Sequence, residues 1–192
     1  MMLRSRRTVW DSVADWRRRV GETICKQEEG EMPRHEEQKM LTYTADELFL
    51  VMADVKDYPS FVPWCSGARI HRQDPQEIIA DLEIGFGPFR ESFTSEVMLD
   101  RPRQVLVRAA EGGPLEHLTN TWTFTPAGGG THVDFVIDFQ FKSHRLDHVA
   151  NSMFQEAATR MMGAFESRTH LVRIMLQRLR PTRTAYAPRR DP

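Results

Sequence analysis

Side chains that commonly carry out chemistry are few in this sequence, and their spacing forms no recognisable catalytic set. His144 and His148 lie four residues apart and would share one helix face, but no third ligand is near them in sequence, so we predict a solvated pair and no metal site. Cys65 has no basic neighbour close in sequence to lower its pKa, which favours a buried structural thiol over a nucleophile. Because no nucleophile, base and orienting group can be assembled, we expect a protein that is not an enzyme.

Two further segments resemble chemical motifs only in part. The run from Gly85 to Arg90 begins like a dinucleotide-binding fingerprint, but Arg90 replaces the third glycine and Pro88 removes an amide, so we predict a turn. Glu91 falls in phase with Phe93 on the next predicted strand, and we expect this carboxylate at the strand start to be solvent-exposed.

Composition and charge exclude several classes of protein. The 192 residues carry a net charge of -1, and residues 32–177 are acidic, which argues against nucleic acid as a partner. Two cysteines cannot build a disulfide framework and suit a reducing compartment. The longest apolar run, residues 48–53, is far shorter than the roughly 20 residues that cross a bilayer.

Hydrophobic periodicity predicts the elements that would position any site. Residues 35–42 form a first strand, and Thr44 with Glu47 forms a capping box for a helix from Ala45 to about Val55. Four weaker strands follow at residues 67–72, 77–84, 89–99 and 104–109. A strong strand pair, residues 118–125 and 133–141, is joined at Gly128–Gly130, and a helix covers residues 146–179. At roughly 50 Å its last turns would project beyond the sheet.

The inward faces of the strand pair and of the long helix form one apolar surface. The strands contribute Leu118, Trp122, Phe124, Val133, Phe135, Ile137, Phe139 and Phe141, with Asn120 as the one polar member. The helix contributes Met153, Phe154, Met161 and Phe165. A filled core and a ligand cavity need the same residue types, so composition does not choose between them.

The segment from Tyr58 to Cys65 holds three aromatic residues and two prolines. Its prolines prevent a long helix or a central strand. Two interpretations remain open: its rings fill the core as a connector, or Phe61 and Trp64 form a lip over a cavity mouth that rests at a membrane interface.

Both ends of the chain are predicted to lie outside the folded domain. Residues 1–32 are an N-terminal extension, disordered or weakly helical, with three interpretations: a mitochondrial-type leader, a disordered extension, or residues upstream of a start at Met32. Asp11 and Asp15 argue against a leader. Residues 33–180 form the domain, and residues 181–192 form a disordered basic tail.

A resemblance to a known family rests on the string from Tyr58 to Ile70, Tyr-Pro-Ser-Phe-Val-Pro-Trp-Cys-Ser-Gly-Ala-Arg-Ile. Together with residues 43–49, 89–93, 122–124, 133–142 and 164–168, it resembles the coenzyme Q-binding proteins of the START-like (polyketide cyclase/lipid transport) superfamily, over about residues 33–175. The resemblance implies an α+β helix-grip fold, a curved antiparallel sheet wrapped around a long C-terminal helix and enclosing a hydrophobic tunnel.

The resemblance also implies a function: non-catalytic binding and chaperoning of ubiquinone or its polyprenyl precursors, in support of quinone biosynthesis and respiration. No cofactor is expected other than ubiquinone as bound ligand. The expected location is the cytoplasmic face of a bacterial inner membrane, as a peripheral protein, or the matrix side of the mitochondrial inner membrane if the leader is real; quinone-biosynthesis enzymes are possible partners. The residues expected to bind the ligand are Tyr58, Phe61, Val62, Trp64, Phe93, Trp122, Phe124, Phe135, Ile137, Phe139, Met153, Phe154, Met161 and Phe165.

Two other functions remain as alternatives. Bacterial relatives within the resemblance are named for inhibiting ribosome association, which implies a ribosomal subunit as partner, although the acidic body should repel RNA phosphate. A cyclase-type enzyme on this fold is disfavoured, because the inner face offers almost no titratable groups.

Overall fold

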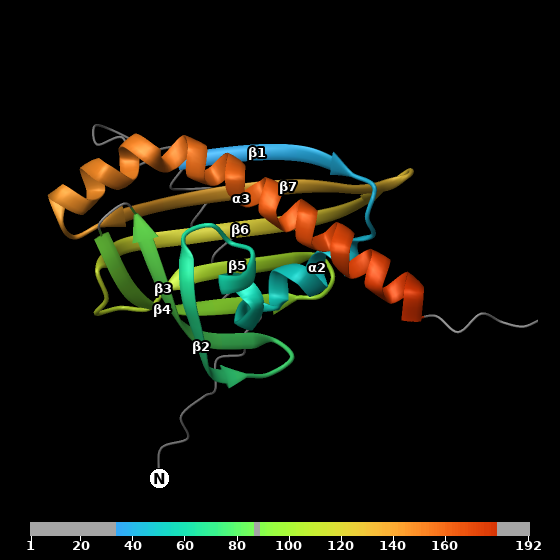
Figure 1. Cartoon of the computed structure of the whole chain (residues 1–192), viewed down its shortest axis with the longest axis horizontal. Coiled ribbons are helices and arrows are strands. Elements are labelled where there is room, and N and C mark those ends of the chain that lie inside the picture. The colour runs from blue at the N-terminus through green and yellow to red at the C-terminus, as the bar shows by residue number, and fades with distance from the viewer. Residues whose placement is uncertain (1–33, 87–88, 180–192) are drawn as a thin grey trace, which may run out of the picture. The chain divides into compact units, whose positions relative to one another are not determined.

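The computed structural model describes residues 34–86 and 89–179, apart from the side chains of residues 86, 89, 144–155 and 179. The predicted extension and basic tail lie outside the described residues. In chain order the elements are β1 (Arg34–Leu41), α2 (Ala45–Ala53), the 3₁₀-helix η1 (Val55–Ser60), β2 (Cys65–Gln73), β3 (Glu77–Phe86), β4 (Phe89–Asp100), β5 (Gln104–Ala109), β6 (Leu115–Ala127), β7 (Gly130–Phe141) and α3 (His144–Leu179). All strands join one antiparallel sheet in the order β1-β7-β6-β5-β4-β3-β2, and α3 runs across one face of it (Figure 1). The predicted α+β helix-grip fold is confirmed.

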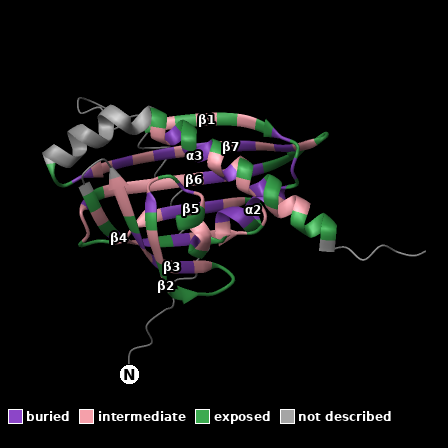
Figure 2. Cartoon of the chain, in the orientation of Figure 1, coloured by how far each residue is buried: buried purple, intermediate pink, exposed green. Residues whose placement is uncertain are grey.

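The strand pair β6–β7 forms the most regular part of the sheet. Buried and half-buried residues alternate along the whole of β7, as expected for a strand with one face on the core (Figure 2). The connecting loop is shorter than predicted, because Gly130 already pairs with Ala127 and leaves two loop residues. Gly129 has a φ of 95°, which glycine adopts without strain, and a Cβ on Gly130 would lie 2.0 Å from the Leu41 carbonyl oxygen.

The start of α2 is fixed by the predicted capping box. The Thr44 Oγ1 accepts a hydrogen bond from the Glu47 amide at 3.2 Å, and the Glu47 carboxylate accepts one from the Thr44 amide at 2.8 Å. The helix ends at Ala53, two residues earlier than expected, because Asp54 leaves the helical conformation. The chain then forms η1, which contains Pro59.

The long helix α3 begins at His144, two residues before the predicted start, and ends where predicted. It is fastened to β1 by an ion pair between Lys39 and Glu166, and the Arg173 guanidinium donates to the Thr42 carbonyl at 2.8 Å. Its C-terminal turns expose Leu171 and Met175, in agreement with turns that leave the sheet (Figure 1). Among the described helices, none has the length and apolar character needed to cross a membrane.

The core lies between α3 and the face of the sheet that it crosses. Its largest fully buried side chains include Trp122, Phe124 and Phe135. Buried hydroxyls in this interior are paired: Thr131 donates to the Tyr43 carbonyl at 2.8 Å, and Ser95 donates to the Ala80 carbonyl at 3.1 Å.

Candidate functional site

A cavity of about 120 Å³ lies between the sheet and α3. Apolar side chains make up most of its wall, and the lining residues whose side chains carry polar groups are Tyr58, Cys65, Asn120 and the two tryptophans. It is lined by Tyr58, Val62, Trp64, Cys65, Leu82, Ile84, Phe93, Val107, Leu115, Leu118, Asn120, Trp122, Ile137, Phe139, Phe141, Ala157, Ala158, Met161 and Phe165. The interior is therefore partly vacant.

One side of the cavity is formed by inward residues of β6 and β7, which we call the sheet wall: Leu118, Asn120, Trp122, Ile137 and Phe139. Period-two alternation places these side chains on one face. Register pairs Trp122 with Phe135, and their rings stack with centroids 4.2 Å apart. Phe135 is fully buried on the same face of the sheet and packs against the Trp122 ring beside the wall.

The opposite side is one face of α3. Ala157, Ala158, Met161 and Phe165 fall at helical spacing, so their side chains share that face. The two alanines are short, and we attribute the vacant volume beside them to that shortness.

Two lining residues, Tyr58 and Phe165, belong to a cluster of side chains between the η1 region and α3 that we call the seam: Asp57, Tyr58, Phe61, Phe165 and Arg168. The rings of Tyr58, Phe61 and Phe165 meet edge-on with centroids 5.1 to 5.8 Å apart. Arg168 forms an ion pair with Asp57 and lies 5.8 Å from the Phe61 ring centroid. The Tyr58 hydroxyl donates to the Met52 carbonyl at 2.5 Å, and burial raises the pKa of this phenol.

The structure places nine of the predicted ligand residues around this cavity. They are Tyr58, Val62, Trp64, Phe93, Trp122, Ile137, Phe139, Met161 and Phe165. Met153 and Phe154 lie in α3, but their side chains are outside the described residues, as are those of His144 and His148.

Three predicted residues do not line the cavity: Phe61, Phe124 and Phe135. The Phe135 ring is covered by Trp122 and approached by the His35 ring at 6.0 Å. Phe124 lies further along β6 toward the turn and is fully buried. Phe61 is half-buried on the seam, against Phe165 and Arg168.

The prediction also missed part of the cavity lining. Leu82, Ile84 and Val107 come from strands whose alternation in sequence is weaker, Leu115 lies before the predicted start of its strand, and Cys65 begins β2. Nothing in the sequence marked Ala157 and Ala158 as cavity residues, because alanine is common on the core-facing side of a helix.

The polar groups at the cavity are suited to holding a neutral guest. Burial raises the pKa of the Cys65 thiol, whose Sγ donates to the Gly67 carbonyl at 3.4 Å, so its thiolate form is disfavoured. Within the described residues, no three His, Cys, Asp or Glu side chains gather as a metal site would require. Glu91 is half-buried at the start of β4, less exposed than expected, and does not line the cavity.

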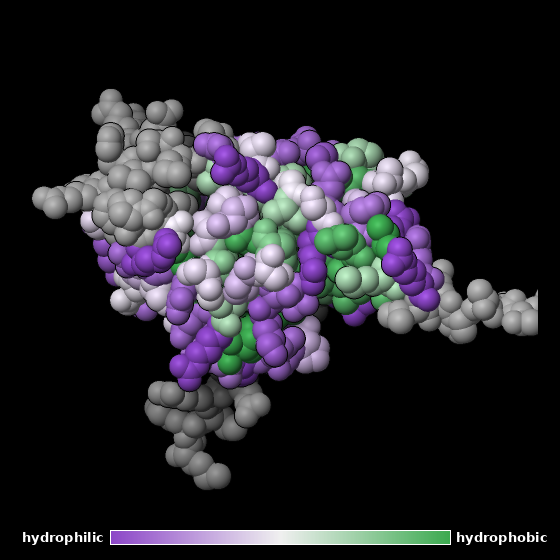
Figure 3. Space-filling model, viewed as in Figure 1, coloured by the Kyte–Doolittle hydropathy of each residue, from purple (hydrophilic) through white to green (hydrophobic). Residues whose placement is uncertain are grey.

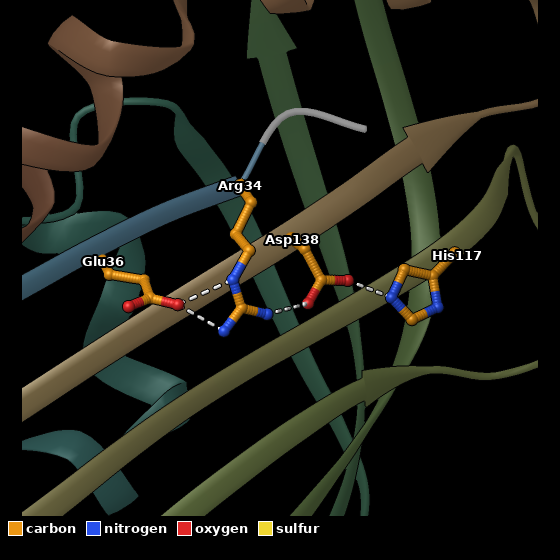
Figure 4. Close-up of polar contacts among 4 residues, drawn as sticks. All are labelled: Arg34, Glu36, His117 and Asp138. Atoms are coloured by element: carbon orange, nitrogen blue, oxygen red, sulfur yellow. Dashed lines mark hydrogen bonds and ion pairs between the residues drawn. The ribbon is translucent and has the colours of Figure 1, made fainter. Parts of the chain in front are cut away.

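A separate polar network lies on the opposite face of the sheet. Asp138 forms ion pairs with Arg34 and His117, and Arg34 also binds Glu36 (Figure 4). The hydrogen bond to Asp138 raises the pKa of His117. Since Asp138 alternates with the wall residues Ile137 and Phe139, this network points away from the cavity.

Known proteins resemble this chain in sequence. The ribosome association toxin RatA of Rickettsia prowazekii is 38% identical over 133 residues, covering 68% of this chain and 91% of that protein. The mitochondrial coenzyme Q-binding protein COQ10 homolog B of Xenopus laevis is 32% identical over 136 residues, covering 69% of this chain and 56% of that protein. The chain therefore spans little more than half of the frog relative.

Solved structures resemble it in fold. The 18 kDa protein CC1736 of Caulobacter crescentus is 37% identical with a TM-score of 0.60, over 74% of this chain and 99% of that one. The Zhui aromatase/cyclase of Streptomyces sp. R1128 has a TM-score of 0.64 over 73% of this chain and 94% of that one, but is 17% identical and shows the fold alone.

The family described as polyketide cyclase / dehydrase and lipid transport matches residues 41–166, which include η1, the whole β2–β7 sheet region and the cavity-lining part of α3. The chain belongs to this START-like family.

Proposed function

We propose that this protein binds ubiquinone or a polyprenyl precursor in the cavity and carries it without chemical change. The observation that carries the proposal is the partly vacant apolar interior beneath the seam, in a chain related to a protein named for binding coenzyme Q. The polar side-chain groups among the lining residues are a phenol, a thiol, an amide and two indole N–H groups. Such a set suits binding of a neutral guest better than acid–base catalysis.

The physical need for such a carrier follows from the tail of the lipid. Each buried methylene contributes roughly 0.8 kcal/mol to membrane affinity, so a polyprenyl tail rarely leaves a bilayer unaided. An apolar cavity lowers this barrier if its opening meets the membrane. Hydrophobic surface is exposed in the middle of the face that α3 crosses (Figure 3), which would allow such contact.

The cavity must enlarge to take its guest. Its volume of about 120 Å³ is below the roughly 300–1,000 Å³ of most small-molecule sites. The sheet wall is held by continuous backbone hydrogen bonding, whereas the seam is held by side chains alone. We therefore expect expansion by separation of η1 from α3.

We place the protein at the cytoplasmic face of a bacterial inner membrane, as a peripheral protein that serves quinone-biosynthesis enzymes. The basic tail, residues 181–192, would add roughly 1 kcal/mol per charge near anionic lipid. Unchanged liposome binding at low salt after removal of this tail would reject its part in the association.

Extraction of the purified protein with organic solvent, followed by mass spectrometry, tests the proposal. We expect a co-purifying polyprenyl quinone, and we expect Ala157→Leu to reduce it because the added side chain fills the cavity. Ser167→Leu is the matched control, since Ser167 is exposed on the same helix. Equal lipid content in both variants, or no lipid in any, would contradict quinone binding.

A second candidate function is binding to a ribosomal subunit, favoured by the 38% identity to the Rickettsia protein named as a ribosome association toxin. Co-sedimentation with ribosomal subunits separates the two candidates. This second function would be supported if lipid-free protein co-sedimented with the subunits and the Ala157→Leu variant co-sedimented equally well. The cavity would then not be needed for ribosome binding.

A further inference from the structure

Asn120 is the one amide side chain in the cavity lining. It lies in the middle of β6, opposite Val107 of β5 and Ile137 of β7. Its neighbours on the same strand face are Leu118 and Trp122. The amide is therefore surrounded by apolar side chains within the sheet wall.

The Asn120 Oδ1 is buried and makes no hydrogen bond. The hydroxyls of Thr131, Ser95 and Thr169 are buried as well, but each donates to a backbone carbonyl. Among the described residues, the one other buried side-chain oxygen without a hydrogen bond belongs to Asp57, whose charge is paired with Arg168. A neutral amide oxygen left unpaired in an apolar wall is unfavourable for the empty protein, which points to a partner that arrives with the guest.

We propose that Asn120 is the hydrogen-bonding anchor for the oxygen-bearing ring of the guest, so that the polar end of the lipid is held inside the cavity at β6. This inference rests on the proposed function and specifies how it is achieved. An amide offers both kinds of group: its Nδ2 donates to a quinone carbonyl, and its Oδ1 accepts from the hydroxyl of the reduced quinol. A turn of the amide about its last side-chain bond exchanges the two. The site would then hold both redox states and select ring oxygens over plain hydrocarbon.

The test compares two probes by titration calorimetry: a ubiquinone analogue with a short alkyl tail, and an alkylbenzene with the same tail. We expect Asn120→Leu to weaken binding of the quinone by about fivefold, the size of one lost net hydrogen bond, and to leave binding of the alkylbenzene unchanged or tighter. The melting temperature should stay the same or rise, because the variant removes an unpaired buried amide. A purely structural role for Asn120 would lower it.

Leu118→Val is the matched control, since it shortens a neighbouring side chain of the same wall and should affect both probes alike. Asn120→Val provides a second apolar variant if the leucine does not fit. Equal weakening of both probes by Asn120→Leu, or no change for either, would overturn the anchor while leaving lipid binding intact. Failure of the unmodified protein to bind either probe would overturn the proposed function, and the anchor with it.

Discussion

The sheet wall and the seam enclose the same cavity but are built differently. The wall is part of β6 and β7, which pair along their length, and the fully buried Phe135 packs beside it on the same face. The seam joins η1 to α3 through edge-on aromatic contacts and the Asp57–Arg168 ion pair, whose side chains keep 30% and 28% of their surface exposed. Regions with few backbone hydrogen bonds between elements open at lower free energy. The comparison indicates a rigid wall and a seam that opens more readily. Under the proposed function, the wall would hold the guest and the seam would admit it.

The largest effect should come from the support of the wall. Phe135→Ala removes a fully buried ring stacked on Trp122, so we expect a loss of about 3–5 kcal/mol in the free energy of unfolding. Urea denaturation measures it, with Val136→Ala on the opposite face as the control. A loss below about 1 kcal/mol would show that the wall is not the rigid side of the cavity.

Trp64 sharpens the comparison, because it lines the cavity and is half-buried. We expect Trp64→Ala to slow quinone transfer between liposomes by about tenfold while costing less stability than Phe135→Ala. Phe61→Ala is the companion variant, because Phe61 belongs to the seam without lining the cavity. If Trp64→Ala destabilises the fold but folded molecules transfer quinone normally, Trp64 is a core residue only.

A smaller effect is expected from the ion pair of the seam. A double-mutant cycle with Asp57→Asn and Arg168→Gln should give a coupling of about 0.5–1 kcal/mol, reduced by partial exposure. Each single variant should take up a short-tailed quinone faster in stopped-flow measurements, because the seam opens more readily. Slower uptake in both variants would argue that the pair organises the entrance and does not restrain it.

The smallest effect concerns the network on the opposite face. Asp138 raises the pKa of His117 in the folded protein above its ordinary value of 6.5. The resulting stabilisation is fully present below that ordinary value and is lost as the pH rises through the raised pKa. Asp138→Asn should therefore flatten the dependence of unfolding free energy on pH above about pH 6.5, without changing quinone affinity. A change in affinity would connect this network to the cavity.

Much of the fold is predictable from local patterns. Strict alternation from Val133 to Phe141 fixes the inward face of β7, and the Thr44–Glu47 pair fixes the start of α2. These signals are local in sequence, so they can be recognised without knowledge of the tertiary structure.

The cavity is predictable only in part. Phe135 and Ile137 share one face of β7, yet Phe135 is packed against Trp122 beside the cavity and Ile137 lines the cavity. Periodicity gives the face of a residue, but sheet curvature and the path of α3 decide its distance from the vacant space. The same holds for Ala158, whose small size matters only because α3 lies against the sheet at that point.

Intermolecular nuclear Overhauser effects test most directly whether the vacant interior accepts a guest. With a short-tailed ubiquinone bound, we expect contacts from its ring methyl protons to the Met161 and Ala158 methyl groups, which line the cavity. Contacts confined to exposed side chains such as Leu171 and Met175, with the Met161 and Ala158 signals unchanged, would show that the quinone binds outside and that the cavity is not its site.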